Sequence, residues 1–202
     1  MGWPEVMPGT TDRPAAWHDR VVPSGDVAQL ARELNARCHL RGRFVLRSGQ
    51  VSDSYFDKYL FEADPQLLAR VTGAMQTLIP AGTDLLGGLE LGGIPLVTML
   101  SHAAGIPALF VRKQAKEYGT RRLAEGGDPA GQTVVLVEDV ITTGGAVIAA
   151  ARALRELGAT VTTVVCAIDR SRPRASDLGR AGIAVRSVLT KDMLDAAADV
   201  AT

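Results

Sequence analysis

The chain has 202 residues, with 22 lysines and arginines balanced by 22 aspartates and glutamates, and 47% of its residues are hydrophobic. This length and composition predict a single globular domain with a substantial core. The zero net charge argues against a protein that binds nucleic acid over a broad basic surface. No uncharged apolar run is long enough to span a bilayer, and the order of segments typical of a signal peptide is missing.

The two cysteines, Cys38 and Cys166, are too few for a disulfide scaffold, and both fall in apolar stretches. We expect both thiols to be buried, reduced and inert. The three histidines are scattered, none near a second histidine or a cysteine, so the sequence predicts no zinc site. These features favour a soluble, cytoplasmic protein.

The first part of the chain is expected to hold a leader, a helix and a hairpin. Residues 1–23 contain four prolines and little periodicity, which predicts an extended or disordered leader. A helix is expected to begin near residue 24 and to stop at Arg41-Gly42, because glycine commonly ends helices. Two strands, at 44–47 and 54–60, then predict a hairpin.

From Asp64-Pro65 onward, apolar strands alternate with helices. This dipeptide starts a helix, with the aspartate as its cap and the proline in its first turn. Strands are expected at 84–86, 108–111, 133–137, 160–168 and 183–188, and helices after Gly93 and from about Gly145 to Leu157. The alternation predicts an α/β fold, with a central, mostly parallel sheet flanked by helices. Ligands of such sheets bind at the carboxyl ends of the strands.

One of these strand ends carries the most informative stretch, Glu138-Asp139-Val140-Ile141-Thr142-Thr143-Gly144-Gly145-Ala146. Its glycines let backbone N–H groups approach a ligand, its threonines add hydroxyl donors, and the following helix N-terminus favours an anion such as phosphate. The two acids would repel a phosphate, but they suit the hydroxyls of a ribose or a nearby Mg²⁺. A plain strand-to-helix turn explains them poorly, because unpaired charges at the end of a buried strand are destabilising. The stretch predicts a ribose 5-phosphate site.

A basic segment, Arg112-Lys113-Gln114-Ala115-Lys116-Glu117-Tyr118, follows the strand at 108–111. The connection runs to about residue 131, and loops of this length in a compact domain are commonly lids or binding loops. Its charge predicts an anionic target, such as a diphosphate leaving group. The alternative is an ordinary solvated charged loop.

Together these stretches resemble the orotate phosphoribosyltransferases, a branch of the type I phosphoribosyltransferases. The acidic stretch is similar to that family's phosphoribosyl-diphosphate signature, and the pattern Arg-Lys-x-x-Lys-x-(His/Tyr)-Gly to its catalytic loop. The resemblance implies that Glu138 and Asp139 hold the ribose hydroxyls and that the residues from Val140 to Ala146 hold the 5-phosphate. It implies diphosphate contacts from Arg112, Lys113, Lys116 and Tyr118, with Lys116 and Asp139 catalytic.

The base-binding side of the site also follows from the resemblance. The hairpin is similar to the family's N-terminal hood, where Arg47, Tyr55 and Phe56 would cover the flat ring of orotate. The alternative is an amphipathic hairpin with core aromatics. Arg170, just past a buried strand, matches the family arginine that binds the orotate carboxylate together with Thr142.

A loop from Gly88 to Pro95 resembles another diphosphate-binding segment of the family. Some relatives carry a lysine at the position of Gly92. This chain would therefore contact diphosphate there through its backbone only.

The resemblance covers residues 24 to about 190. It implies a single phosphoribosyltransferase domain, 24–202, with a hood built mainly from about 24–62 and a core from about 63–190. The leader predicted for residues 1–23 lies outside the resemblance. The resemblance also implies a homodimer that shares the basic loop between subunits, and Mg²⁺ bound mainly through phosphoribosyl diphosphate. No nucleic-acid or membrane partner is expected.

The implied activity transfers the 5-phosphoribosyl group from phosphoribosyl diphosphate to orotate, giving orotidine 5′-monophosphate and diphosphate in UMP biosynthesis. Two alternatives stay open: a phosphoribosyltransferase that acts on a purine base, and a non-catalytic regulator that binds phosphoribosyl diphosphate. The lysines Lys113 and Lys116 and the zero net charge favour an enzyme over the regulator.

Overall fold

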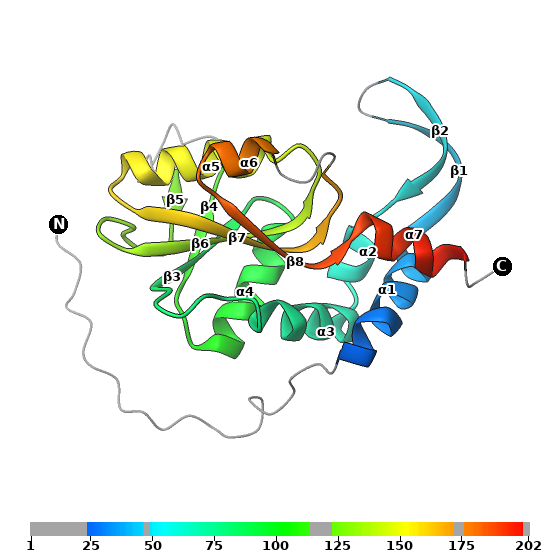
Figure 1. The fold of residues 1–202 in the computed structure, drawn as a ribbon, viewed down its shortest axis with the longest axis horizontal. Helices are drawn as coiled ribbons and strands as arrows, with labels where there is room; N and C mark the ends of the chain where they lie inside the picture. The colour runs from blue at the N-terminus through cyan, green and yellow to red at the C-terminus, as the bar shows by residue number, and fades with distance from the viewer. Residues whose placement is uncertain (1–23, 47–48, 114–122, 172–175, 200–202) are drawn as a thin grey trace.

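The computed structural model describes residues 24–46, 49–113, 123–171 and 176–199. At its centre lies a six-stranded sheet with the strand order β5-β4-β3-β6-β7-β8 (Figure 1). Every neighbouring pair is parallel except β4 and β5, so the predicted mostly parallel sheet is confirmed. The strands are β3 (Leu85–Leu89), β4 (Ala108–Val111), β5 (Ala124–Glu125), β6 (Thr133–Ile141), β7 (Thr160–Asp169) and β8 (Ala184–Thr190).

Helices cover both faces of the sheet. Helices α3 (Pro65–Gln76) and α4 (Gly93–Ala104) lie on one face, and α5 (Gly145–Glu156) and α6 (Ser176–Arg180) on the other (Figure 1). Successive strand residues point to opposite faces. In β6, accordingly, the side chains of 135 and 137 pack with the α3 and α4 cluster, whereas those of 134 and 136 pack with α5.

The N-terminal helix and a separate hairpin form the hood, residues 24–62. Helix α1 (Ser24–Cys38) leads directly into β1 (His39–Val45), which pairs antiparallel with β2 (Val51–Phe56). The short helix α2 (Tyr59–Glu62) follows, and the C-terminal helix α7 (Lys191–Asp199) packs against α1. Figure 1 shows the hairpin projecting away from the main sheet beyond α1 and α7.

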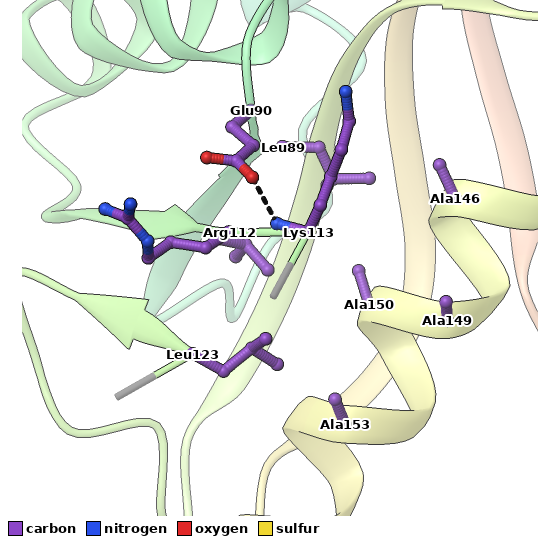
Figure 2. A pocket seen from close by; sticks show the side chains of 10 residues that line it. Leu89, Glu90, Arg112, Lys113, Leu123, Ala146, Ala149, Ala150 and Ala153 are labelled. Atoms are coloured by element: carbon purple, nitrogen blue, oxygen red, sulfur yellow. Dashed lines mark hydrogen bonds between the residues drawn. The ribbon is translucent and has the colours of Figure 1, made fainter. Parts of the chain in front are cut away.

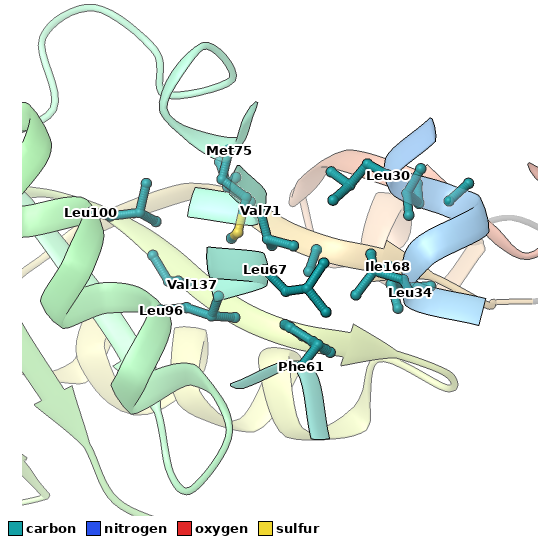
Figure 3. Packing of buried hydrophobic residues seen from close by; sticks show 14 of the residues in the cluster. Leu30, Leu34, Phe61, Leu67, Val71, Met75, Leu96, Leu100, Val137 and Ile168 are labelled. Carbon is teal, nitrogen blue, oxygen red and sulfur yellow. The ribbon is translucent and has the colours of Figure 1, made fainter. Parts of the chain in front are cut away.

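A single buried cluster joins the hood to the sheet (Figure 3). Leu30 and Leu34 of α1 and Phe61 of α2 are fully buried there, against Leu67 of α3 and Ile168 of β7. Burying a leucine or phenylalanine side chain contributes about 1.5–3 kcal/mol, so these residues hold the base of the hood firmly against the sheet edge.

The start of α3 confirms the cap predicted at Asp64-Pro65. The Asp64 side chain accepts hydrogen bonds from the backbone N–H groups of Gln66 (3.0 Å) and Leu67 (3.2 Å), and Pro65 occupies the first turn. Such a cap satisfies N–H groups that have no partner within the helix.

The predicted end of the first helix was wrong. Helix α1 ends at Cys38 and β1 begins at His39, so Gly42 lies inside a strand, at a register shift between Arg41 and Phe44. Glycine is common at such strand irregularities as well as at helix ends, and the pairing with β2 decides between the two.

Further strand boundaries differ, among them that of the strand expected at 84–86, which is β3 and runs from Leu85 through both glycines to Leu89. The strand expected at 54–60 is β2, which ends at Phe56, and α2 takes the following residues. The strand expected at 133–137 continues through both acids to Ile141, because β7 pairs with it over its whole length.

The leader predicted for residues 1–23 lies outside the described residues. Within the described part of the chain, no helix is both long and apolar enough to cross a membrane. Both cysteines are fully buried and unpaired, as expected. Burial raises the pKa of Cys38 to about 11 and also raises that of Cys166, so both thiols stay protonated near neutral pH.

Candidate active site

The acidic pair lies near the carboxyl end of β6, between β3 and β7. The Asp139 side chain is completely buried, and Glu138 is half-buried. Oε2 of Glu138 is buried without a hydrogen-bond partner among the described residues. Burial raises the pKa of Glu138 to about 8, the charge of Asp139 adds to this shift, and the charges of Lys58 and Lys113 oppose it. A buried carboxyl group with a free acceptor atom can receive a hydroxyl donor from a ligand.

Asp139 is held by residues of the hood. Lys58, in the turn between β2 and α2, forms an ion pair with Oδ2 of Asp139. Burial lowers the pKa of the Lys58 ammonium, but its hydrogen bond with Asp139 and the nearby negative charges outweigh burial, and the net shift is upward. Glu62 of α2, only 8% exposed, lies beside the same carboxylate. Its pKa is raised to about 8, first by burial and then by the hydrogen bond with Asp139 and the charge of Asp139.

Gly92 lets the loop after β3 approach this cluster. Its φ of −68° is ordinary for any residue. A Cβ added there, however, would overlap Oδ2 of Asp139 and come within 3.0 Å of Oε1 of Glu62. The glycine is therefore required by lack of space and not by backbone conformation.

Residues Thr142 to Gly144, which we call the Thr/Gly loop, connect β6 to the N-terminus of the 12-residue helix α5. Gly144 has φ +76°, and a Cβ there would lie 2.8 Å from the Leu178 side chain, so only glycine fits. The backbone N–H of Gly145 donates to Oγ1 of Thr143 (3.4 Å), and Thr142 and Thr143 are exposed. The loop thus presents hydroxyls and a helix N-terminus to solvent, the features that bind phosphate.

The predicted diphosphate loop, Gly88 to Pro95, leaves β3 beside the end of β4. The peptide bond between Glu90 and Leu91 is cis. The Glu90 carboxylate accepts a hydrogen bond from the backbone N–H of Lys113 (2.6 Å). Arg112 is half-buried and Lys113 exposed, and the Arg112 N–H donates to the carbonyl of Leu123 (2.9 Å). This hydrogen bond joins the chain just before residues 114–122 to the chain just after them. Residues 114–122, which include Lys116 and Tyr118, lie outside the described residues.

A pocket of about 150 Å³ lies beside these two loops. Figure 2 shows the α5 alanines on one side of it and the ends of β3 and β4 on the other. It is lined by Leu89, Glu90, Val111, Arg112, Lys113, Leu123, Ala146, Ala149, Ala150 and Ala153. Its lining includes two cations, Arg112 and Lys113, and one acid, Glu90, next to the Thr/Gly loop.

The predicted base-binding residues fall into two groups. The Arg170 guanidinium lies 5.6 Å from the centroid of the Phe56 ring, and its backbone N–H donates to the carbonyl of Ile141 (2.8 Å). Tyr55 is exposed and contacts Phe44, with ring centroids 5.5 Å apart. Adjacent strand residues point to opposite faces, so Tyr55 does not share the side of Phe56. Arg47 lies outside the described residues.

The structure therefore brings the predicted acids, the Thr/Gly loop, Arg112, Lys113 and Arg170 to neighbouring strand ends of one sheet. Sequence reasoning missed Lys58 and Glu62. No local pattern in the sequence could have found them, because their contacts with Asp139 join segments that lie far apart in the chain. Within the described residues, no group of three or more His, Cys, Asp or Glu side chains is placed to hold a metal ion.

Comparisons with known proteins agree with this geometry. Residues 61–181 match the model of the phosphoribosyl transferase domain family. An orotate phosphoribosyltransferase from Nocardioides sp. is 64% identical over 170 residues, which cover 84% of this chain and 95% of that protein.

Solved structures give the same result. A Mycobacterium tuberculosis H37Rv orotate phosphoribosyltransferase has a TM-score of 0.75 at 35% identity, covering 84% of this chain and 98% of the other. A structure of the enzyme from the same organism in complex with phosphoribosyl diphosphate has a TM-score of 0.71 at 31% identity, covering 84% and 99%. The chain therefore belongs to the orotate phosphoribosyltransferase family, transferases of pyrimidine biosynthesis.

Proposed function

We propose that the chain transfers the 5-phosphoribosyl group from phosphoribosyl diphosphate to orotate, with orotidine 5′-monophosphate and diphosphate as products. The observation that carries this proposal is the acidic end of β6 leading into the Thr/Gly loop at the N-terminus of α5, next to Arg112 and Lys113. The Thr/Gly loop suits a phosphate, and the two acids suit the hydroxyls of a sugar. The adjacent cations, Arg112 and Lys113, suit a diphosphate.

In this proposal the sugar donor is held at two places. The hydroxyls and backbone N–H groups from Thr142 to Ala146 bind the 5-phosphate, and Glu138 and Asp139 accept hydrogen bonds from the ribose hydroxyls. When the bond between C1 and the diphosphate oxygen breaks, positive charge develops on the ribose and negative charge on the diphosphate. The Asp139 carboxylate stabilises the first charge, and cations of the basic segment stabilise the second.

The diphosphate is assigned to Arg112, Lys113, Lys116 and Tyr118. Lys116 is the main catalytic lysine in this assignment. Tyr118 donates a hydrogen bond but carries no charge near neutral pH, so the cationic contribution falls to the other three residues. Loop closure over the site would exclude water that otherwise hydrolyses the donor.

Orotate is assigned to the side where Arg170 faces Phe56. A guanidinium binds a carboxylate through two parallel hydrogen bonds, and an aromatic face packs on a flat pyrimidine. Thr142 is exposed and close in the chain to Ile141, whose carbonyl accepts from Arg170. Arg47 belongs to the same proposed set, whereas Tyr55 points to the opposite face of β2 from Phe56 and is left out of it. Purine bases lack a carboxylate, so Arg170 favours orotate over the purine alternative.

Magnesium enters this proposal as part of the substrate. Mg²⁺ bound to the diphosphate would neutralise part of its negative charge, and the described residues need not supply a separate metal site.

A homodimer with a shared basic loop is also part of the proposal. The residues on either side of the loop, Lys113 and Leu123, line this chain's own pocket, so the sharing is tested by complementation. Mixing inactive Lys116→Ala protein with inactive Glu138→Gln protein should restore activity if the loop of one subunit serves its partner's site. No recovery, at a ratio where mixed dimers are confirmed by tag-specific pull-down, would contradict sharing.

We place the protein in the cytoplasm, which is in keeping with its two unpaired thiols.

The direct test is an assay of orotate consumption with phosphoribosyl diphosphate and Mg²⁺, with adenine, hypoxanthine and uracil as control bases. Of these four bases, we expect only orotate to be consumed, with formation of orotidine 5′-monophosphate. Turnover with a purine in place of orotate would support the purine alternative. Calorimetric binding of phosphoribosyl diphosphate without turnover of any base would support the regulator.

A further inference from the structure

The hood contacts the acidic end of β6 through a buried ion pair. Lys58 is 30% exposed, whereas its partner Asp139 is completely buried. The backbone N–H of Val140 donates to the other oxygen of the Asp139 carboxylate, Oδ1. Buried ion pairs need such additional hydrogen bonds to offset the loss of water, and the orientation of the carboxylate is fixed as a result.

A second carboxyl group lies against the same aspartate. Glu62 is more than nine-tenths buried, and its Oε1 has no hydrogen-bond partner among the described residues. Two adjacent carboxyl groups in a buried site do not both ionise readily, because like charges repel there strongly. With one proton between them, the single positive charge of Lys58 balances the single remaining negative charge.

The cluster touches three parts of the proposed site. Lys58 and Glu62 belong to the hood, Asp139 adjoins Glu138 on β6, and the backbone of Gly92 lies directly on the Asp139 carboxylate. A shift of this carboxylate would therefore disturb the hood, the diphosphate loop and the ribose side together.

We propose that Lys58 and Glu62 are positioning residues for phosphoribosyl transfer. They hold the Asp139 carboxylate beneath Gly92 and so fix the hood and the diphosphate loop relative to the ribose site. This inference rests on the proposed function and deepens it, since neither residue belongs to the set assigned to substrate.

The cluster should respond to pH through Glu62. The ionisable groups around it are Asp57 and Lys58 before α2, Cys38 at the end of α1, and Glu138 and Asp139 on β6. The Cys38 thiol stays neutral, since its pKa is about 11. When Glu62 loses its proton near pH 8, its charge repels Asp139 and weakens the arrangement. Donor binding and turnover should then decline above that pH.

The experiment measures kcat and kcat/KM for phosphoribosyl diphosphate from about pH 6 to about pH 9.5. In Glu62→Gln, which keeps a neutral hydrogen-bonding side chain, the decline above pH 8 should shrink or vanish. The control is Glu156→Gln, which changes an exposed acid at the end of α5. It should show the same decline above pH 8 as the unmodified protein. An unchanged decline in Glu62→Gln would overturn the role of Glu62, because Glu138 would then account for it.

Lys58→Met should lower kcat/KM for phosphoribosyl diphosphate by about tenfold or more, and Lys58→Arg should recover most of the loss. Lys191→Met is a matched control, because Lys191 is also ion-paired and its side chain is also 30% exposed, but it lies on α7. Equal effects of Lys58→Met and Lys191→Met would overturn the proposal. If circular dichroism shows that Lys58→Met does not fold, the test rests on Lys58→Arg. A pH profile like that of the unmodified protein, with kcat/KM within twofold of it, supports the proposal. A loss in kcat/KM of about tenfold contradicts it.

Failure of the proposed function is detected separately, by the orotate assay on the unmodified protein. If that assay shows no turnover, the same variants are compared by calorimetric titration with phosphoribosyl diphosphate over the same pH range. The positioning role then predicts weaker binding in Lys58→Met and a flatter pH profile in Glu62→Gln. Donor affinities equal to those of the two controls would overturn it.

Discussion

The Arg170 guanidinium lies over the face of the Phe56 ring, 5.6 Å from its centroid, and so connects the end of β7 to the hood. A guanidinium is attracted to the face of an aromatic ring without using up its N–H donors, so these remain available to a ligand. The proposed base-binding side therefore joins two segments that are far apart in the sequence. Changes to either residue should affect the base more than the sugar donor.

Arg170→Ala is expected to raise the KM for orotate by about tenfold to a hundredfold, the range for losing hydrogen bonds to a charged group. The effect on kcat should be smaller, since the carboxylate is bound before and during transfer. Steady-state kinetics with each substrate varied would measure both. Arg180→Ala, an exposed arginine on α6, is the control, and an unchanged KM for orotate in Arg170→Ala would refute the assignment.

Lys116→Ala should lower kcat by about two orders of magnitude or more, because a cation on the leaving diphosphate stabilises charge that develops in the transition state. The fold should be unaffected, as judged by circular dichroism and the midpoint of thermal unfolding. Near-normal turnover in this variant would remove the basic segment from the mechanism.

Gly92→Ala tests the close approach at Asp139. The backbone at position 92 accepts any residue, but the new methyl group would overlap Oδ2 of Asp139 and displace it. We expect a loss in kcat/KM for phosphoribosyl diphosphate of about tenfold or more, measured by initial rates. Gly179→Ala on α6 is the matched control, since a Cβ there meets no atom within 4 Å and should be tolerated. Equal activities of the two variants would contradict the geometry.

Stability should decline with pH because of the two buried glutamates. The folded-state pKa values of Glu62 and Glu138, about 8, exceed the ordinary 4.5, so the folded protein binds more protons than the unfolded chain between these values. The free energy of unfolding should therefore fall as pH rises from about 4.5 to 8 and then level off. Urea unfolding at several pH values would measure the slope. Glu62→Gln and Glu138→Gln should each reduce it, and a slope unaffected by both would contradict the assignment.

The sequence was sufficient for the fold class and for the position of the site. A short apolar run followed by glycines is a local pattern that marks the end of a buried strand. The acidic stretch from Glu138 to Ala146 could therefore be placed at a strand end from the sequence. The end of β6 could not be placed, because acidic residues are uncommon inside strands and usually follow them. The structure continues it through Val140 and Ile141, which pair with Ile168 and Asp169 of β7.

Lys58 and Glu62 escaped the sequence analysis for a different reason. Their role depends on contacts between the hood and β6, and no local pattern reports a contact between segments so distant in the chain. A charged residue after a hairpin is usually solvated, so Lys58 offered no sign that its partner, Asp139, would be buried. The opposite directions of Tyr55 and Phe56 were, by contrast, accessible from the alternation of side chains along a strand.

The crowding over Asp139 has an evolutionary consequence. A homologue that replaces Gly92 by a larger residue must move or substitute the aspartate's neighbours, and Lys58 is the neighbour whose place a new side chain would compete for. Positions 58 and 92 should therefore covary, with a small residue at one accompanying a long one at the other, and an alignment of related sequences would reveal this exchange.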